Sequence, residues 1–276
     1  MLPKKVLMCE PKYFDINYIG NEYMTNLNAD FDKNLAVKQW SDLKTSYENL
    51  GLEVSVIPPV EGLVDMVFTA NQSLPFIDSN GNKKVVLSKM RNPQRADEVK
   101  HFEDFYLKKG YEVINLPEEI EYFESMGDAI IDYKRKIIFG GYGYRTHENV
   151  YDFLKEVTDY EIIKVRLMNK YFYHLDTCFS LLNSNTAMIC RDAFSVEDFK
   201  KITNYFTDII EVSVEENKNS FACNCHCPDG ENVIIDKRAV ETKVMLERNE
   251  FNVTRVDTSE FMKSGGSVFC MKMMYF

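Results

Sequence analysis

The chain lacks any long apolar segment, although 45% of its 276 residues are hydrophobic. No stretch approaches the roughly 18 consecutive apolar residues that a membrane-spanning helix needs. The N-terminus carries Lys4 and Lys5 and then a very short apolar run, which is too short for the core of a signal peptide. These absences predict a cytoplasmic protein without a membrane partner.

The chain also lacks an excess of basic residues. It has 33 Lys and Arg against 43 Asp and Glu, which gives a formal net charge of −10. Nucleic acids and anionic membrane surfaces are bound by basic patches. The charge balance therefore argues against nucleic acid as a partner and fits a small cationic substrate.

Linkers and a disulfide framework are absent as well. No Pro-, Ser- or Gly-rich run and no low-complexity segment interrupts the sequence, which predicts a single domain over residues 1–276. The seven cysteines are an odd number, and in a reducing compartment they are expected to be free thiols.

The chain does contain a loose repeat of strand, strand, amphipathic helix and strand. Apolar residues at helical spacing predict the helices, and Gly51 and Gly110 mark two helix ends. Ser195, with Asp198 three residues later, predicts an N-cap. The expected helices are 35–50, 93–109, 147–157, one opening at 195, and 238–248. The expected strands are 6–9, 54–57, 66–68, 85–87, 113–116, 129–131, 137–139, 161–165, 179–182, 187–189, 209–212, 220–222, 233–235 and 252–256, followed by a strand at the C-terminus.

Five such units of about 50 residues predict an α/β fold in which the repeats are arranged radially, an arrangement that shortens the sheet edges. The expected architecture is thus a five-bladed α/β propeller of ββαβ units in one domain. An ordinary open α/β sheet is the alternative.

Cys270 is the most informative single position, because it lies close to the C-terminus behind Gly265 and Gly266. Chain ends fray unless something ties them down, and the alternating apolar residues here predict pairing into a sheet. That pairing would hold Cys270 at the edge of a pocket whose glycines let the backbone approach a ligand closely. Cys270 is therefore a candidate nucleophile. The alternative is a buried thiol, since free cysteine is among the most buried residue types.

A cysteine nucleophile needs a group that moves protons, usually a histidine, and the chain has only four. His174 stands out because Asp176 follows two residues later in an expected aromatic strand, which would place both side chains on one face. A carboxylate beside an imidazole orients it and raises its pKa. The alternative is a core histidine with one hydrogen bond.

His226 lies in a run that looks like a metal cluster, with Cys223, Cys225 and Cys227. Structural zinc sites usually draw their ligands from two separated pairs, and no second pair exists here. We therefore expect no metal or other cofactor and interpret the run as a solvated turn.

Arg145 follows the glycine-rich segment 140–143 between an expected strand and helix. The segment lacks the glycine spacing and the Gly-Lys-Ser/Thr ending of phosphate loops. Small residues would instead let Arg145 reach a ligand carboxylate, which a guanidinium binds bidentately. A surface salt bridge is the alternative.

Five motifs in a fixed order carry a family resemblance over nearly the whole chain. They are Asp65-x-x-Phe-Thr-x-Asn71, Phe123-Glu124-x-x-Gly127-Asp128, Gly141-Tyr-Gly-x-Arg145-Thr, His174-Leu-Asp176 and Ser264-Gly-Gly…Cys270. The combination resembles the guanidine-modifying superfamily, which has the pentein fold, a five-bladed α/β propeller. That family includes arginine deiminases, dimethylarginine dimethylaminohydrolases, arginine dihydrolases and amidinotransferases.

The resemblance implies roles for individual residues. Cys270 matches the nucleophile, His174 the acid/base, and Glu124 the carboxylate that partners the histidine or the substrate. The residues assigned to substrate binding are Asp65, Asn71, Asp176 and Arg145, with Lys89 or Arg95 as a second anchor for the substrate carboxylate. Asn21 matches an N-terminal asparagine that reaches the pocket in the dihydrolases.

One departure from the family pattern bears on the product. Deiminases and dimethylarginine hydrolases usually have an aspartate where this chain has Asn71. An amide at this position can donate to the oxygen of a ureido intermediate, whereas a carboxylate cannot. The resemblance therefore implies an arginine dihydrolase that gives ornithine, carbon dioxide and ammonia.

Other activities within and outside the family stay open. The alternatives are an arginine deiminase giving citrulline, a dimethylarginine dimethylaminohydrolase, an amidinotransferase, and a non-catalytic arginine-binding pentein. The expected partner is arginine or a related guanidino compound, and a homo-oligomer is left open.

Overall fold

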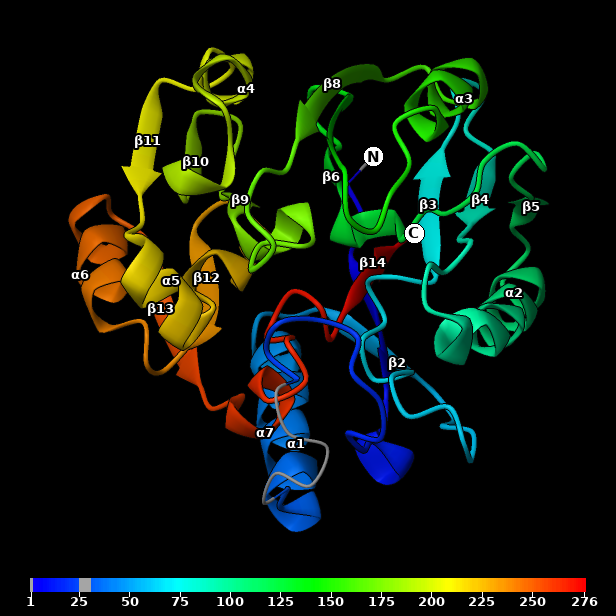
Figure 1. Cartoon of the computed structure of the whole chain (residues 1–276), viewed down its shortest axis with the longest axis horizontal. Helices are drawn as coiled ribbons and strands as arrows, with labels where there is room; N and C mark the ends of the chain where they lie inside the picture. Colours follow the sequence, from blue (N-terminus) through cyan, green and yellow to red (C-terminus); the bar gives the residue numbers. More distant parts are fainter. Residues whose placement is uncertain (1, 25–30) are drawn as a thin grey trace.

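The structure, a computed structural model, describes residues 2–24 and 31–276. Five small sheets surround a common centre, and the helices lie at the periphery (Figure 1). This arrangement is the five-bladed α/β propeller that the sequence repeat predicts, and the open-sheet alternative is wrong.

The second blade shows how each unit is built. Strand β3 (Ser73–Ile77) pairs antiparallel with β4 (Lys83–Leu87), and the chain then crosses through helix α2 (Val99–Lys108) to β5 (Glu112–Ile114), which pairs parallel with β4. In this blade β3 faces the centre, and α2 lies on the outside (Figure 1).

The third and fourth blades repeat this order. Their elements are β6 (Ala129–Asp132), β7 (Ile137–Tyr142), α3 (Val150–Val157) and β8 (Glu161–Arg166), followed by β9 (Phe179–Leu181), β10 (Thr186–Ile189), α4 (Val196–Thr203) and β11 (Asp208–Glu211). Ser195 caps α4 as expected, since its side chain accepts a hydrogen bond from the Asp198 amide.

In the fifth blade a single bridge between His226 and Ile234 takes the place of the inner strand. It is preceded by helix α5 (Val214–Ser220), and β12 (Asn232–Asp236), α6 (Val240–Arg248) and β13 (Asn252–Val256) complete the blade.

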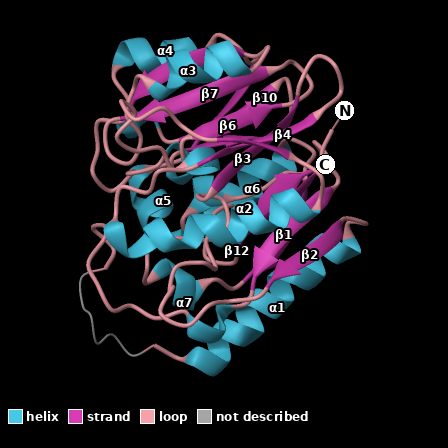
Figure 2. Cartoon of the chain, turned by 90° about the vertical axis from the view of Figure 1, so that its right-hand side faces the viewer, coloured by secondary structure: helices cyan, strands magenta, loops and turns pink. Residues whose placement is uncertain are grey.

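The two chain ends share the remaining blade. Strand β1 (Lys5–Cys9), helix α1 (Lys33–Asn49) and β2 (Glu53–Ile57) come from the N-terminal part, and the inner strand β14 (Met273–Tyr275) comes from the C-terminus after the short helix α7 (Ser259–Met262). In the side view α1 runs along β1 and β2 (Figure 2). The pairing of β14 with β1 ties the chain end down, as the sequence predicts for the segment after Cys270.

Three local expectations are wrong. Residues 66–68 form turns rather than a strand, and residues 220–222 lie at the junction of α5 and a 3-10 turn where Phe221 has a φ of 50°. His174 precedes the 3-10 turn Leu175–Thr177 instead of lying in a strand. Short apolar runs do not distinguish buried turns from strands, and all three segments are buried.

Among the residues that the structure describes, no helix has the length and apolar character required to cross a lipid bilayer.

Candidate active site

The predicted site residues gather where the inner strands begin. Asn71 precedes β3, Glu124 precedes β6, His174 precedes β9 and Cys270 precedes β14. Asn71, His174 and Cys270 line one cavity, so the starting ends of their strands lie close together. Seven of the ten predicted residues line a small cavity of about 20 Å³ there: Asn21, Asp65, Asn71, Arg95, Arg145, His174 and Cys270.

Cys270 lies at the base of this cavity, 3% exposed. Its Sγ is 3.2 Å from Asp176 Oδ2 and accepts a hydrogen bond from Asn224 Nδ2 at 3.2 Å. Burial and the charge of Asp176 raise the pKa of the Cys270 thiol well above its ordinary value. Burial also raises the pKa of Asp176, to about 7. The Cys270 thiol is therefore protonated and donates a hydrogen bond to Asp176.

His174 is oriented by Glu124 rather than by Asp176. Its Nε2 lies 2.8 Å from Glu124 Oε2, and both side chains are almost completely buried. Burial would raise the pKa of Glu124, but Arg145 and the imidazole outweigh it and hold that pKa well below its ordinary value. Glu124 is thus a fixed anion beside the imidazole. The expected pairing of His174 with Asp176 is wrong, because the turn at Leu175–Thr177 directs the two side chains to different neighbours.

Arg145 and Arg95 are both buried in the wall of the cavity. Arg145 Nη1 is 3.0 Å from Glu124 Oε2, and its Nη2 donates to the Gly20 carbonyl at 2.6 Å. Arg95 forms an ion pair with Glu98 at 3.0 Å. Arg145 is therefore not the surface salt bridge considered as its alternative.

Asn71 has an orientation that its neighbours dictate. Arg95 Nη1 lies 2.9 Å from Asn71 Oδ1, and a guanidinium can only donate, so that atom must be the amide oxygen. Asn71 Nδ2 is buried and has no hydrogen-bond partner among the described residues. A Cβ at Gly127 would lie 2.6 Å from Asn71 Nδ2 and 3.0 Å from His174 Nδ1. Gly127 thus leaves room for the amide to lie beside the imidazole.

Asp65 and Asn21 form the opposite wall. Asp65 accepts a short hydrogen bond from Tyr18 and lies 3.5 Å from Ser264 Oγ. Asn21 Nδ2 donates to the Ser264 carbonyl at 2.9 Å, and Gly265, with a φ of 88°, packs against the Asn21 amide. A Cβ at Gly265 would lie 2.7 Å from Asn21 Nδ2 and one at Gly266 2.3 Å from the Phe68 ring, so the two glycines leave room for these side chains.

Lys89 is separated from the cavity. Its Nζ donates to the carbonyls of Pro117 and Ile120 at 2.6 and 3.0 Å, so it holds a neighbouring loop. Of the two candidates for a second carboxylate anchor, only Arg95 lines the cavity.

Several residues of the site carry no distinct sequence signal. Asn224 donates to Cys270 Sγ and to the Asp176 carbonyl, and its Oδ1 accepts from the amides of Ser267 and Cys270. It sits inside the cysteine-rich run, which drew attention to metal binding instead. Tyr18 and Tyr173 line the cavity, and among the 16 tyrosines of the chain nothing marks them.

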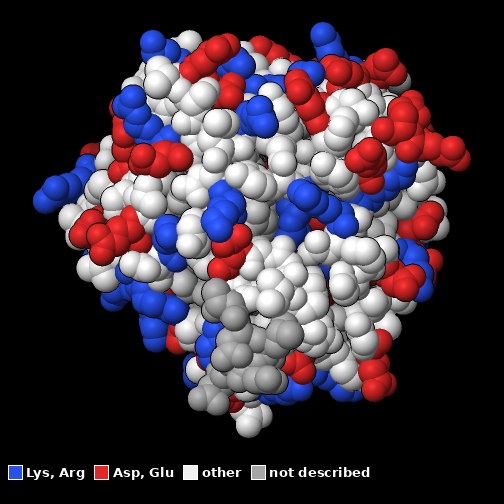
Figure 3. All heavy atoms as spheres, in the orientation of Figure 1, with Lys and Arg blue, Asp and Glu red and all other residues white. Residues whose placement is uncertain are grey.

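The cysteine-rich run is buried rather than solvated. Cys225 contacts Ser180 Oγ, and His226 Nδ1 lies 3.2 Å from the Tyr47 hydroxyl. Within residues 2–24 and 31–276, no group of three or more His, Cys, Asp or Glu side chains is arranged to hold a metal ion. On the face drawn in Figure 3, basic and acidic side chains are interspersed rather than gathered in one basic area.

The cavity is thus lined by the Cys270 thiol, the His174 imidazole with its fixed carboxylate partner, the Asp65 carboxyl group and the Asn71 amide. A thiol and imidazole are the components of nucleophilic catalysis, and paired carboxylates suit a planar cation.

Comparisons with known proteins agree with this chemistry. A family model described as "N,N dimethylarginine dimethylhydrolase, eukaryotic" matches residues 10–276. The N(G),N(G)-dimethylarginine dimethylaminohydrolase of Mycobacterium tuberculosis is 30% identical over 97% of this chain and 84% of its own length. The bifunctional arginine dihydrolase/ornithine cyclodeaminase ArgZ of Synechocystis is also 30% identical, over 98% of this chain. This chain spans 37% of the length of ArgZ.

Solved structures of related enzymes have the same fold as this chain. The N-terminal domain of ArgZ, described as an arginine dihydrolase from the ornithine-ammonia cycle in cyanobacteria, superposes with a TM-score of 0.91 at 29% identity. The match covers 98% of this chain and 97% of that domain, which was solved with substrate bound.

Proposed function

The chain belongs to the dimethylarginine dimethylhydrolase family of guanidine-modifying hydrolases with the pentein fold, and from this premise we propose that it hydrolyses the guanidinium group of arginine through a covalent intermediate on Cys270. Arginine loses both terminal nitrogens in two rounds at the same thiol. The products are ornithine, carbon dioxide and two molecules of ammonia.

The first step is attack of the Cys270 thiolate on the guanidinium carbon. The Cys270 thiol has a raised pKa, and the substrate cation lowers it, as nearby positive charge does for a thiolate, so that the thiol passes its proton to His174. The guanidinium edge lies against Asp176 and Glu124, which accept charge-assisted hydrogen bonds. A carbon–sulfur bond forms, a carbon–nitrogen bond breaks, and His174 gives its proton to the departing ammonia.

Water completes the first round. His174, now neutral, takes a proton from a water molecule, and the hydroxide adds to the thiouronium carbon. The carbon–sulfur bond breaks, the thiolate is restored, and the product is the ureido group of citrulline. His174 therefore acts first as acid and then as base, which its fixed contact with Glu124 supports.

The orientation of Asn71 is the observation that carries the second round. Arg95 holds the amide oxygen, so the unpartnered Nδ2 is the atom available to the ligand. That N–H can donate to the ureido oxygen and stabilise negative charge on it during a second attack. Cys270 then displaces the second ammonia, water cleaves the thioester-like intermediate, and the resulting carbamate of ornithine releases carbon dioxide.

The remaining residues of the cavity are assigned to the amino-acid end of the substrate. Asp65 is the acceptor for the ammonium group, while Arg145 and Asn21 provide donors for the carboxylate. The existing cavity of about 20 Å³ holds little more than a water molecule, so a wall must move outward when arginine enters.

Product analysis tests the proposal. Purified protein is incubated with arginine, and ornithine, citrulline and ammonia are quantified against a Cys270→Ala control. Ornithine formed with little citrulline supports two rounds. Citrulline accumulating without ornithine would refute the dihydrolase assignment, and turnover by the Cys270→Ala protein would refute the thiol mechanism.

Dimethylarginine is the second candidate substrate, because the matching family model and the mycobacterial relative both carry that description. The same assay with dimethylarginine decides between the two: dimethylamine release at a higher kcat/KM than that for arginine would favour it. The cytoplasmic location, the single domain over residues 1–276 and the oligomeric state stay predictions.

A further inference from the structure

A second and larger cavity of about 300 Å³ lies at the opposite end of the propeller axis. Its walls come from the ends of the inner strands and the turns that follow them, including 132–134 at the end of β6, 182–184 after β9 and 228–230 after the His226 bridge. The active-site residues precede the same strands. The two cavities therefore lie at opposite ends of the propeller axis. The proposed reaction does not use the larger cavity.

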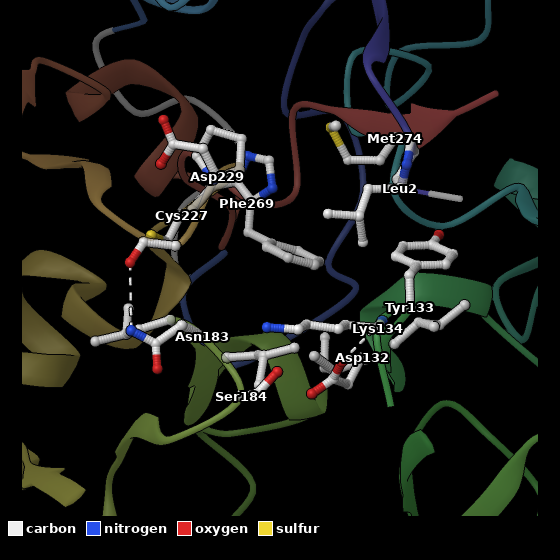
Figure 4. A pocket seen from close by; sticks show the side chains of 18 of the residues that line it. Leu2, Asp132, Tyr133, Lys134, Asn183, Ser184, Cys227, Asp229, Phe269 and Met274 are labelled. Atoms are coloured by element: carbon white, nitrogen blue, oxygen red, sulfur yellow. Dashed lines mark hydrogen bonds between the residues drawn. The ribbon is translucent and has the colours of Figure 1, made fainter. Parts of the chain in front are cut away.

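The larger cavity has the size and character of a ligand site. Pockets for small molecules begin at about 300 Å³ and have mainly apolar walls with a few polar groups. Leu2, Tyr133, Phe269 and Met274 border the space in Figure 4, together with Lys134 and Ser184 at its edge.

The acidic side chains at the edge are already neutralised or solvated. Asp132 Oδ2 is 2.6 Å from Arg135 Nε, and Asp132 Oδ1 accepts from the amides of Lys134 and Arg135. Asp229 accepts from the amides of Glu231 and Asn232. These carboxylates do not require a cationic ligand, and they leave the positive charges of the cavity available.

Within the described part of the chain, Lys272 is the buried cation of this cavity that lacks a hydrogen-bond acceptor. It lines the cavity and is completely buried, and its Nζ has no hydrogen-bond acceptor among the described residues. The ammonium lies 3.2 Å from the centre of the Phe269 ring. A buried ammonium normally has a partner, because the desolvation of an unpaired charge is costly.

No side chain of the described residues accepts a hydrogen bond from Lys272 Nζ. Burial lowers the pKa of Lys272 to about 7, although the charges of Asp176 and Cys270 on the active-site side raise it. The neighbouring His226 is buried, which lowers its pKa well below the usual value, so it stays neutral. An anion on the cavity side would complete the coordination of the ammonium.

We propose that this cavity binds a small monocarboxylate with an apolar chain, with its carboxylate paired to Lys272 and its chain against Phe269, Met274 and Leu2. The ligand differs from the arginine of the catalytic site in charge and polarity. The proposal does not depend on the reaction assigned to Cys270.

Calorimetric titration of the full chain with isocaproate tests this site. Its neutral amide and isoamylamine serve as ligands of similar shape without the negative charge. We expect one isocaproate to bind at millimolar or lower concentration, and we expect at least tenfold weaker binding of the amide and the amine, since a charge-assisted pair is lost.

Two variants locate the bound ligand. Lys272→Met removes the cation, and Ser184→Trp fills the edge of the cavity without touching the buried core; each should weaken isocaproate binding at least tenfold. Ser79→Trp, in the exposed β3–β4 turn, is the matched control and should bind as the unmodified chain does. Absence of isocaproate binding, equal binding of the amide, or unchanged binding by the Ser184→Trp protein would overturn the proposal.

Discussion

Replacing Asn71 with aspartate should convert the proposed dihydrolase into a deiminase. In the structure Arg95 donates to Asn71 Oδ1 at 2.9 Å, and that contact survives the substitution because a carboxylate oxygen accepts the same hydrogen bond. The change is confined to Nδ2, which becomes a second acceptor. It then faces the ureido oxygen, so a donor is lost and two acceptors oppose each other.

The expected magnitude follows from the loss of that donor. Removing one hydrogen-bond donor from a developing oxyanion lowers the rate by about 10²–10³, or about 2.7–4 kcal/mol. The first round should be spared, because a carboxylate near the cationic guanidinium is favourable. We therefore expect arginine consumption to continue while the rate of ornithine formation falls by about a hundredfold or more.

Carbon-13 NMR of arginine labelled at the guanidino carbon measures both rounds in one sample. The unmodified chain should pass label to carbonate, and the Asn71→Asp protein should hold it as citrulline. Asn204→Asp, an exposed position beyond the end of α4, makes the same chemical change and should leave the products unaltered. Equal ratios of ornithine to citrulline from the Asn71→Asp and unmodified proteins would refute the role assigned to the amide.

Cys270→Ala should abolish turnover while arginine binding, followed by calorimetry, is retained; a loss of binding with normal folding would assign Cys270 to recognition instead. Arg145→Met removes the guanidinium partner of the buried Glu124 carboxylate and should lower the free energy of unfolding by about 3–5 kcal/mol, measured by urea denaturation; a change below 1 kcal/mol would contradict the burial of that pair. Gly127→Ala places a methyl group against the Asn71 amide and should lower kcat at least tenfold with little change in stability, which stopped assays and thermal unfolding report; unchanged kcat would show that the wall relaxes. Because burial and Asp176 raise the pKa of the Cys270 thiol, its alkylation by iodoacetamide should stay slow up to about pH 8.5, the ordinary range of a cysteine, and should accelerate only above it; a plateau near neutral pH would mean that the free site holds a thiolate.

The repeat pattern allowed the fold to be predicted. In each blade the apolar residues of the helix recur at the spacing that is typical of an amphipathic helix packed on a sheet. Helix ends at Gly51 and Gly110 agree with the structure, since both residues have positive φ angles of 75° and 76°. The segments 66–68 and 220–222 were wrongly predicted as strands, because buried apolar turns resemble short strands in sequence.

Only the site residues that lie in the sequence motifs could be predicted. Cys270, His174 and Asn71 converge as the motif order implied, because each lies shortly before an inner strand. The partner of His174 was misjudged because spacing in sequence does not reveal a 3-10 turn. Asn224 was missed because its contribution depends on the folded position of the fifth blade, where no inner strand marks the site.

The covalent intermediate on Cys270 is the central claim, and mass spectrometry of the acid-quenched protein during turnover of arginine tests it most directly. The account predicts a transient mass increase on the C-terminal peptide that contains Cys270, carrying the label of guanidino-labelled arginine and disappearing as substrate is exhausted. Turnover of arginine with no label on that peptide at any quench time would contradict it.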